Sequence, residues 1–134
     1  MIIRLISFTD RGARLANRLA EGLSGTAMRC GQPLSLDDWT KESFSAADAL
    51  IFVGAVGIAV RAIAPYVRSK LHDPAVVVVD ETGAFAVSLL SGHLGGANDV
   101  TRQVARLCGA VPVITTATDC SGVFAVDSWA RMQG

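Results

Sequence analysis

The chain has 134 residues, 51% of which are hydrophobic, and its 12 Lys and Arg residues balance 12 Asp and Glu residues. This length and apolar content favour one domain with a packed core and exclude a disordered chain. The balanced charge gives no general attraction to nucleic acid or to an anionic membrane, and no apolar run is long enough to span a bilayer.

Strands and helices alternate in the first half of the chain. Apolar runs predict three strands, namely Ile2–Phe8, the short Ala27–Cys30, and Ala49–Val53. After the first strand, leucines at helical spacing behind a Thr9 or Asp10 cap predict a helix. Residues 36–48 are expected to form a short helix or a loop. A further helix is expected to begin after Gly54 and to end near Pro65.

The second half of the chain begins with AVVVVDETGAFAVSLL, which predicts two strands joined by a tight turn from Asp80 to Gly83. Both arms are nearly all apolar, so we expect the pair to lie inside a sheet that is covered on both sides. A helix is expected after His93, with Gly109 as its stop, and a last strand over Val111–Thr115. The apolar stripe of that helix consists of Val100, Val104, Leu107 and Cys108.

This alternation predicts an α/β fold: a three-layer, mostly parallel sheet with one β-hairpin, Rossmann-like, in a single domain over residues 1–134. In such sheets, ligands bind where strands run into helices. Four junctions of this kind, FTDRG, FVGAVG, LLSGHLGGAN and VITTATD, are rich in Gly, Ser, Thr or Asp. We expect all four at one edge of the sheet, and His72, which precedes a strand, at the opposite edge.

The histidine in SGHLGGAN is the strongest candidate for chemistry. His93 follows a predicted buried strand and precedes a helix whose first N–H groups, near Gly96 to Asn98, can stabilise an oxyanion. An imidazole there can take a proton from water near neutral pH and return it to a leaving group. The alternative is a loop histidine that binds a backbone carbonyl. No second histidine supports a metal site.

Other junction residues have both a ligand-binding and a structural interpretation. Gly54 and Gly57 can let an anion approach the N–H groups of a helix start, or can simply permit close packing of helix and sheet. Thr115, Thr116 and Asp119 follow the last predicted strand and can face a ligand or cap a turn.

The cysteines indicate the compartment. Cys30, Cys108 and Cys120 are far apart and form no C-x-x-C pair, which argues against a disulfide scaffold and favours a reducing environment. The N-terminal MIIRLISFTD has an arginine within its apolar stretch and no small-residue cleavage site, so it predicts a strand rather than a secretory signal. We therefore expect a cytoplasmic protein.

The combination of motifs resembles one known family. The stretch GAVGIAVRAIAPYVRSKLHDPAVVVVDETGAFAVSLLSGHLGGAND, followed by VPVITTATD and FAVDSWA, is similar to the N-terminal part of the cobalamin-biosynthesis protein CbiG. The likeness runs from about Leu5 to the last residue, and SGHLGGAN and ITTATD are its densest motifs. The resemblance implies the activity of cobalt-precorrin-5A hydrolase, which opens the δ-lactone of a corrinoid intermediate and releases acetaldehyde.

The chemistry that this resemblance implies assigns roles to the candidate residues. We expect His93 to act as the base, with the N–H groups of Gly95 and Gly96 as oxyanion donors. The expected substrate-binding set is Gly54, Gly57, Ser91, Gly92, Gly95, Gly96, Asn98, Thr115, Thr116 and Asp119. No protein metal and no cofactor are expected, because the cobalt is carried by the substrate.

The expected partners are the corrinoid substrate and a CbiG C-terminal domain, which typical family members carry and which this chain lacks. Two other interpretations stay open. The chain could be a non-catalytic corrinoid-binding half-site that needs a separate C-terminal domain. It could also be a nucleotide-binding α/β domain that uses GAVGIA for phosphates and Asp80 for a ribose, although its glycine spacing differs from the dinucleotide fingerprint.

Overall fold

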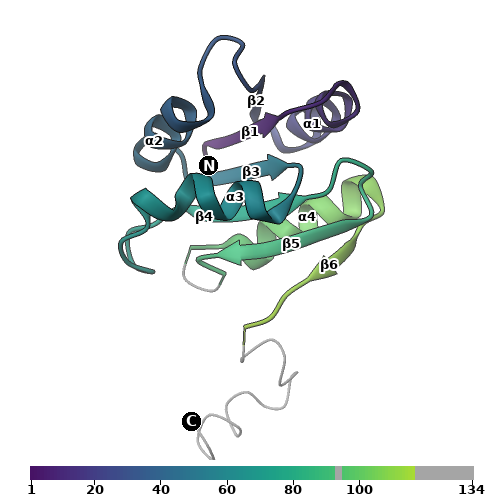
Figure 1. The fold of residues 1–134 in the computed structure, drawn as a ribbon. Helices are drawn as coiled ribbons and strands as arrows, with labels where there is room; N and C mark the ends of the chain where they lie inside the picture. Colours follow the sequence, from purple (N-terminus) through teal and green to yellow (C-terminus); the bar gives the residue numbers. More distant parts are fainter. Residues whose placement is uncertain (93–94, 117–134) are drawn as a thin grey trace, which may run out of the picture.

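The computed structural model describes residues 1–92 and 95–116, in which helices and strands alternate around one sheet (Figure 1). The strands are β1 (Ile3–Ser7), β2 (Thr26–Arg29), β3 (Ala49–Val53), β4 (Ala75–Val79), β5 (Phe85–Leu90) and β6 (Val111–Val113). The helices are α1 (Asp10–Leu23), α2 (Leu36–Ala46), α3 (Val56–Ile63), the 3-10 turn η1 (Ala64–Tyr66) and α4 (Ala97–Cys108).

The strand order in this part of the chain is β2-β1-β3-β4-β5-β6. The first four strands are parallel, whereas β5 pairs antiparallel with β4, and β6 pairs parallel with β5. The prediction of a mostly parallel sheet with one hairpin is therefore confirmed. Because β5 and β6 both run against the other four strands, their carboxyl ends lie at the opposite edge of the sheet.

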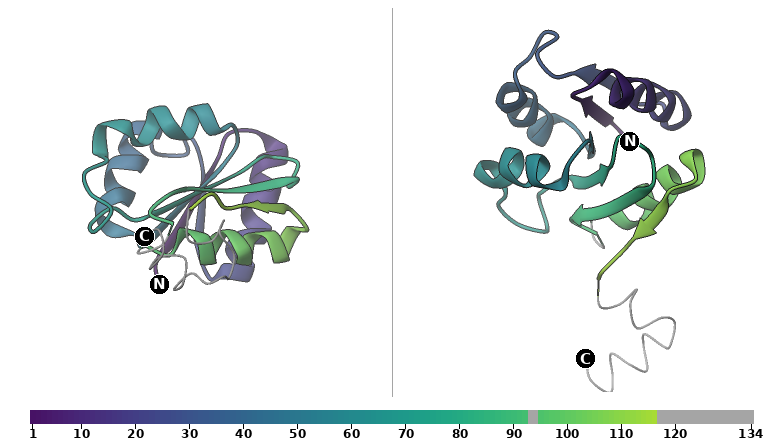
Figure 2. Two further views of the ribbon diagram at one scale, coloured as in Figure 1. Left: turned by 90° about the horizontal axis from the view of Figure 1, so that it is seen from below. Right: turned by 45° about the vertical axis from the view of Figure 1, so that its right-hand side comes forward.

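Two helix layers enclose the sheet, α1 and α4 on one face and α2 and α3 on the other (Figure 2). Successive strand side chains point to opposite faces, so Leu5 packs in the core with Leu19 of α1, and Phe52 packs in the core with Trp39 of α2. The Trp39 and Phe52 rings meet edge to face, with centroids 5.5 Å apart. Burial on both faces explains the continuous apolar runs of β3 and β4 and confirms the three-layer prediction.

Local capping signals confirm several predicted boundaries. The Thr9 hydroxyl accepts a hydrogen bond from the Gly12 N–H at 2.9 Å and caps α1. Residues 36–46, expected as a helix or a loop, form a helix that Ser35 caps in the same way. The strand expected to extend to Thr115 ends at Val113 instead. None of the helices in the described ranges combines the length and apolar character that crossing a bilayer requires.

The hairpin turn between β4 and β5 is built by Asp80. The Asp80 carbonyl accepts a hydrogen bond from the Gly83 N–H at 2.8 Å, and one oxygen of its carboxylate accepts the N–H groups of Ala84 and Phe85 at 2.9 and 2.7 Å. The other carboxylate oxygen accepts the N–H and the hydroxyl of Thr82. Gly83 has a φ of 74°, which favours glycine there. The predicted turn from Asp80 to Gly83 is confirmed.

One burial prediction is confirmed only in part and another is wrong. The β4 arm of the hairpin is buried on both faces, but β5 is only partly covered on the α3 face, where Val87 and Leu89 are half-buried and Phe85 is exposed. Phe85 and Val111, which pair across β5 and β6, are therefore 53% and 54% exposed. Leu107, expected in the buried stripe of α4, is 48% exposed, whereas Val100 and Val104 are buried as predicted.

Candidate functional site

The four glycine- and threonine-rich junctions lie at two opposite edges of the sheet, not at one. FTDRG and FVGAVG follow β1 and β3, whereas LLSGHLGGAN and VITTATD follow β5 and β6, which run the other way. A strand of five residues spans about 17 Å, so the two pairs are separated by roughly that distance. His72 precedes β4 and therefore lies at the edge where β5 ends, contrary to expectation. We call this edge, which holds the ends of β5 and β6, the β5–β6 edge.

The SGHLGGAN loop folds back tightly on the start of α4. The Ala97 N–H donates to the Ser91 carbonyl and the Asn98 N–H donates to the Gly92 carbonyl, both at 3.1 Å. A methyl group on Gly95 would lie 2.5 Å from Ser91 Cβ, and one on Gly92 would lie 2.7 Å from Asn98 Oδ1. Steric packing therefore requires glycine at both positions.

Backbone conformation adds to this requirement. Ser91, with a φ of 58°, and Gly96, with a φ of 86°, are both in the left-handed region, in which glycine is favoured and other residues are uncommon. Gly96 is the N-cap of α4. The described parts of this loop, residues 91–92 and 95–96, thus have a specific backbone conformation next to the end of β5.

Asn98 holds the β5–β6 edge together. Its side chain is buried, at 4% exposure, and its Oδ1 accepts a hydrogen bond from the Ser88 hydroxyl of β5 at 2.7 Å. Its Nδ2 donates to the Thr116 hydroxyl at 3.2 Å. The structure therefore brings Asn98, Thr116 and Gly92 together, with Ser91 beside them, and their role in substrate binding stays a prediction.

Of three other residues that were predicted to lie at this edge, the structure describes only Thr115. Thr115 is exposed at the same edge. His93 and Asp119 lie outside the described residues, so their roles stay predictions. The N–H groups of Ala97 and Asn98 already donate to the Ser91 and Gly92 carbonyls, so they are not available to an oxyanion. Of the predicted oxyanion donors, the N–H groups of Gly95 and Gly96 remain as candidates.

Gly54 and Gly57 lie at the other edge, and the expectation that they share one ligand edge with the SGHLGGAN loop is wrong. The Gly54 N–H donates to the Val79 carbonyl at 2.9 Å, so it extends the sheet instead of facing an anion. A methyl group on Gly54 would lie 3.1 Å from the Phe8 ring. These contacts favour the close-packing interpretation of Gly54.

Asp80 is also unavailable as a ribose ligand. Partial burial by itself raises the pKa of Asp80, but hydrogen bonds from the Thr82 hydroxyl and from the N–H groups of Phe85, Thr82 and Ala84 outweigh it, so the pKa is lowered. The carboxylate is thus committed to the hairpin turn. This removes the acidic residue on which the nucleotide-binding alternative depends.

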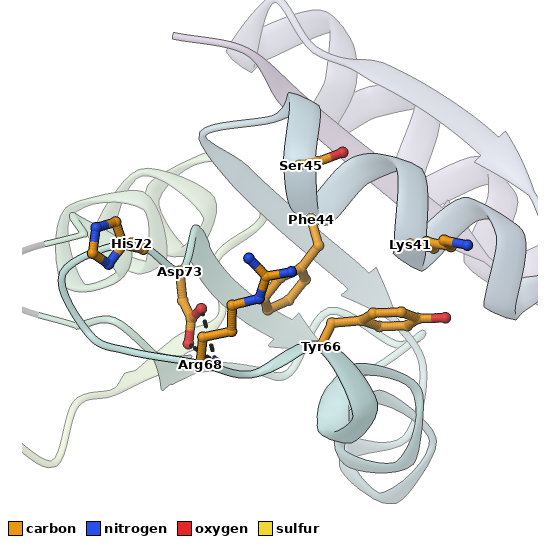
Figure 3. A pocket seen from close by; sticks show the side chains of 7 residues that line it. All are labelled: Lys41, Phe44, Ser45, Tyr66, Arg68, His72 and Asp73. Atoms are coloured by element: carbon orange, nitrogen blue, oxygen red, sulfur yellow. Dashed lines mark hydrogen bonds between the residues drawn. The ribbon is translucent and has the colours of Figure 1, made fainter.

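A cavity of about 340 Å³ lies at the β5–β6 edge, between α2 and the segment that connects η1 to β4 (Figure 3). Its lining residues are Lys41, Phe44, Ser45, Tyr66, Arg68, His72 and Asp73. The Phe44 and Tyr66 rings lie with centroids 6.2 Å apart and planes tilted by 41°. Sequence reasoning missed this cavity, because its side chains come from separate elements and share no motif.

Asp73 connects the cavity to the SGHLGGAN loop. The Asp73 side chain is buried, at 8% exposure, and its carboxylate accepts the N–H groups of Arg68 and Ser69 at 3.0–3.1 Å. The Asp73 carbonyl accepts a hydrogen bond from the Ser91 hydroxyl at 3.3 Å. The cavity and the loop are therefore neighbouring parts of one surface.

Tyr66 is fixed on the other side of the cavity. Its hydroxyl donates to the Asp37 carboxylate of α2. This hydrogen bond, followed by partial desolvation and the negative charges of Asp37 and Asp38, raises the pKa of Tyr66. The phenol therefore remains a neutral donor that ties η1 to α2.

Sequence comparisons match this chain to proteins of cobalamin synthesis. The family model described as cobalamin synthesis G N-terminal matches residues 38–119. A cobalt-precorrin-5A hydrolase of Salmonella typhimurium is 47% identical over 96% of this chain and 39% of its own length. A cobalt-precorrin-5A hydrolase of Priestia megaterium is 46% identical over 68% of this chain and 24% of its own length.

The solved structures agree with this result. A cobalamin biosynthesis protein G homologue from Sulfolobus solfataricus superposes with a TM-score of 0.72 at 29% identity, over 84% of this chain and 36% of that one. The chain thus spans well under half the length of these relatives. Because the family model covers more than half of the residues, the chain belongs to the cobalamin synthesis G N-terminal family.

Proposed function

We propose that this chain is the N-terminal part of a cobalt-precorrin-5A hydrolase of cobalamin biosynthesis. The observation that carries the proposal is the 47% identity with the Salmonella typhimurium hydrolase over 96% of the chain. The compact loop at the end of β5, in which Gly92 and Gly95 are sterically required, supports a specific site at that edge.

The proposed reaction is hydrolysis of a δ-lactone in a corrinoid. His93 takes a proton from water while the water oxygen forms a bond to the lactone carbonyl carbon. The N–H groups of Gly95 and Gly96 stabilise the resulting oxyanion. The bond to the ring oxygen then breaks, and the proton passes to that oxygen, which leaves a carboxylate and an alcohol. The alcohol then loses its O–H proton while the carbon–carbon bond between the two-carbon fragment and the macrocycle breaks. The fragment leaves as acetaldehyde, and the electron pair of that bond and a proton stay with the macrocycle.

Asn98 is proposed to act as a positioning residue. It joins Ser88, the start of α4 and Thr116 through its side chain, and its N–H donates to the carbonyl of Gly92, which precedes His93 in the sequence. No protein metal or cofactor is included in this proposal, because the cobalt arrives within the substrate. A cytoplasmic location is likewise a prediction, supported by the cysteine pattern.

The relatives suggest that the site has a second part. Because the chain spans only 39% of the Salmonella typhimurium hydrolase, we propose that the remaining part of the longer family proteins completes the corrinoid site. In the alternative, this chain binds corrinoids without catalysis until that part is added.

A single-turnover incubation with cobalt-precorrin-5A and trapping of acetaldehyde tests the role of His93. With His93→Ala, we expect the rate to fall on the order of a hundredfold or more. Added imidazole should restore part of the lost rate, because it supplies the missing base without changing the loop. An unchanged rate in His93→Ala would remove His93 from catalysis.

A further inference from the structure

We propose that the cavity between α2 and the η1–β4 segment is a binding subsite for a carboxylate side chain of the corrinoid, with Arg68 and Lys41 as its cations. The inference rests on the proposed function for the identity of the ligand. It assigns the subsite to residues that no sequence motif singled out.

The position of the cavity supports this assignment. It lies at the β5–β6 edge, next to the loop that contains His93, and Asp73 contacts both. A volume of about 340 Å³ is at the lower end of small-molecule sites, which suits one side chain and part of a ring rather than a whole macrocycle. The rest of a bound corrinoid would then extend toward the SGHLGGAN loop.

The charge of the cavity suits a carboxylate. Lys41 and Arg68 are exposed, and within residues 1–92 and 95–116 neither forms an ion pair. The one acidic side chain in the lining, Asp73, is already held by two backbone N–H groups. Both side chains line the cavity, in which an arginine can bind a carboxylate through two parallel hydrogen bonds and a lysine adds a positive charge.

The aromatic side chains give the cavity an apolar wall. Phe44 and Tyr66 come from α2 and η1, and the Arg68 side chain reaches toward the Phe44 ring in Figure 3. The hydroxyl of Tyr66 is tied to Asp37, so the ring is held in place before any ligand binds. A cavity that has an apolar wall and is lined by two cations matches a ligand whose flat, apolar body carries acidic side chains.

An arginine-rich hollow at the opposite edge of the sheet provides the comparison. Arg11, Arg14 and Arg18 of α1 line it together with Glu81 of the hairpin turn, at the opposite edge of the sheet. It has no aromatic side chain in its lining. Arg11 and Arg14 are exposed like Arg68 and Lys41, so Arg11→Ala/Arg14→Ala removes the same two charges far from the β5–β6 edge.

Equilibrium dialysis with cobyrinate, a corrin whose side chains end in free carboxylates, tests the subsite. The double variant Arg68→Ala/Lys41→Ala should bind cobyrinate on the order of tenfold to a hundredfold more weakly than the unmodified chain. Arg11→Ala/Arg14→Ala should bind it as the unmodified chain does. The methyl ester of cobyrinate should bind more weakly, and equally well to all variants. Circular dichroism checks that the variants are folded.

Two results would overturn the inference in different ways. If cobyrinate binds the unmodified chain and the double variant equally, the cavity is not the subsite, and the proposed substrate class stands. If the unmodified chain binds no cobyrinate, the subsite and the proposed substrate class both fail for this chain.

Discussion

Replacing Gly95 with alanine tests whether the SGHLGGAN loop has one required shape. The new methyl group would lie 2.5 Å from Ser91 Cβ and 2.9 Å from the Ser91 carbonyl oxygen. Both atoms belong to a loop that is hydrogen-bonded to the start of α4, so neither can move without breaking those contacts. Overpacking of this kind costs about 1–3 kcal/mol. We expect the free energy of unfolding to fall by that amount.

Gly22→Ala in α1 is the matched control. There, the added methyl group would meet only the tip of Leu107, which is exposed and can turn away. Alanine within a helix is favoured over glycine by about 0.5–1 kcal/mol, so this variant should be as stable as the unmodified chain or more stable. Urea denaturation measures both. A Gly95→Ala variant that matches Gly22→Ala in stability would refute the tight loop.

Three further substitutions probe other contacts. Asp80→Asn should destabilise the chain at pH 7, as measured by urea denaturation. The loss of stability should shrink below about pH 4, because the lowered pKa of Asp80 contributes stability that is lost as the pH falls through that pKa. An equal loss at pH 3 and pH 7 would contradict this. Asn98→Ala should lower the free energy of unfolding by about 1–3 kcal/mol, because the hydroxyl groups of Ser88 and Thr116 lose a partner. The control Asn17→Ala, on the exposed face of α1, should change it by less than about 0.5 kcal/mol. Equal effects of the two variants would count against the role of Asn98. Leu50→Ala, in the buried centre of β3, should lower the free energy of unfolding by about 2–5 kcal/mol, as measured by thermal unfolding. Leu107→Ala, on the exposed side of α4, should lower it by less than about 1 kcal/mol. A comparable loss for both variants would mean that Leu107 is buried.

The elements of the fold were predictable because the hydrophobic period changes clearly along the chain. The continuous apolar runs of β3 and β4 predict strands buried on both faces, and the burial of both strands confirms this. The turn at Asp80 predicted the hairpin, yet we expected the loop after β5 at the same edge of the sheet as the loops after β1 and β3. A tight turn reverses the chain, so the loop after β5 must lie at the edge where β4 begins.

The candidate site was predictable only where it is local in sequence. Asn98, Ser91 and Gly92 lie within one motif, and the structure brings them together. The cavity is different, because Lys41 and Arg68 line one cavity only after α2 and η1 have packed on the same face of the sheet. Only the tertiary arrangement brings these cations and His72 into the lining of the same cavity.

We propose that this chain carries the lactone-opening part of a corrinoid hydrolase. The most direct measurement is acetaldehyde release from cobalt-precorrin-5A by the unmodified chain, alone and mixed with the remaining part of the Salmonella typhimurium hydrolase. We expect acetaldehyde in at least the mixture, and its loss when His93→Ala replaces the unmodified chain. Acetaldehyde from the remaining part alone, at the same rate with or without this chain, would contradict the account.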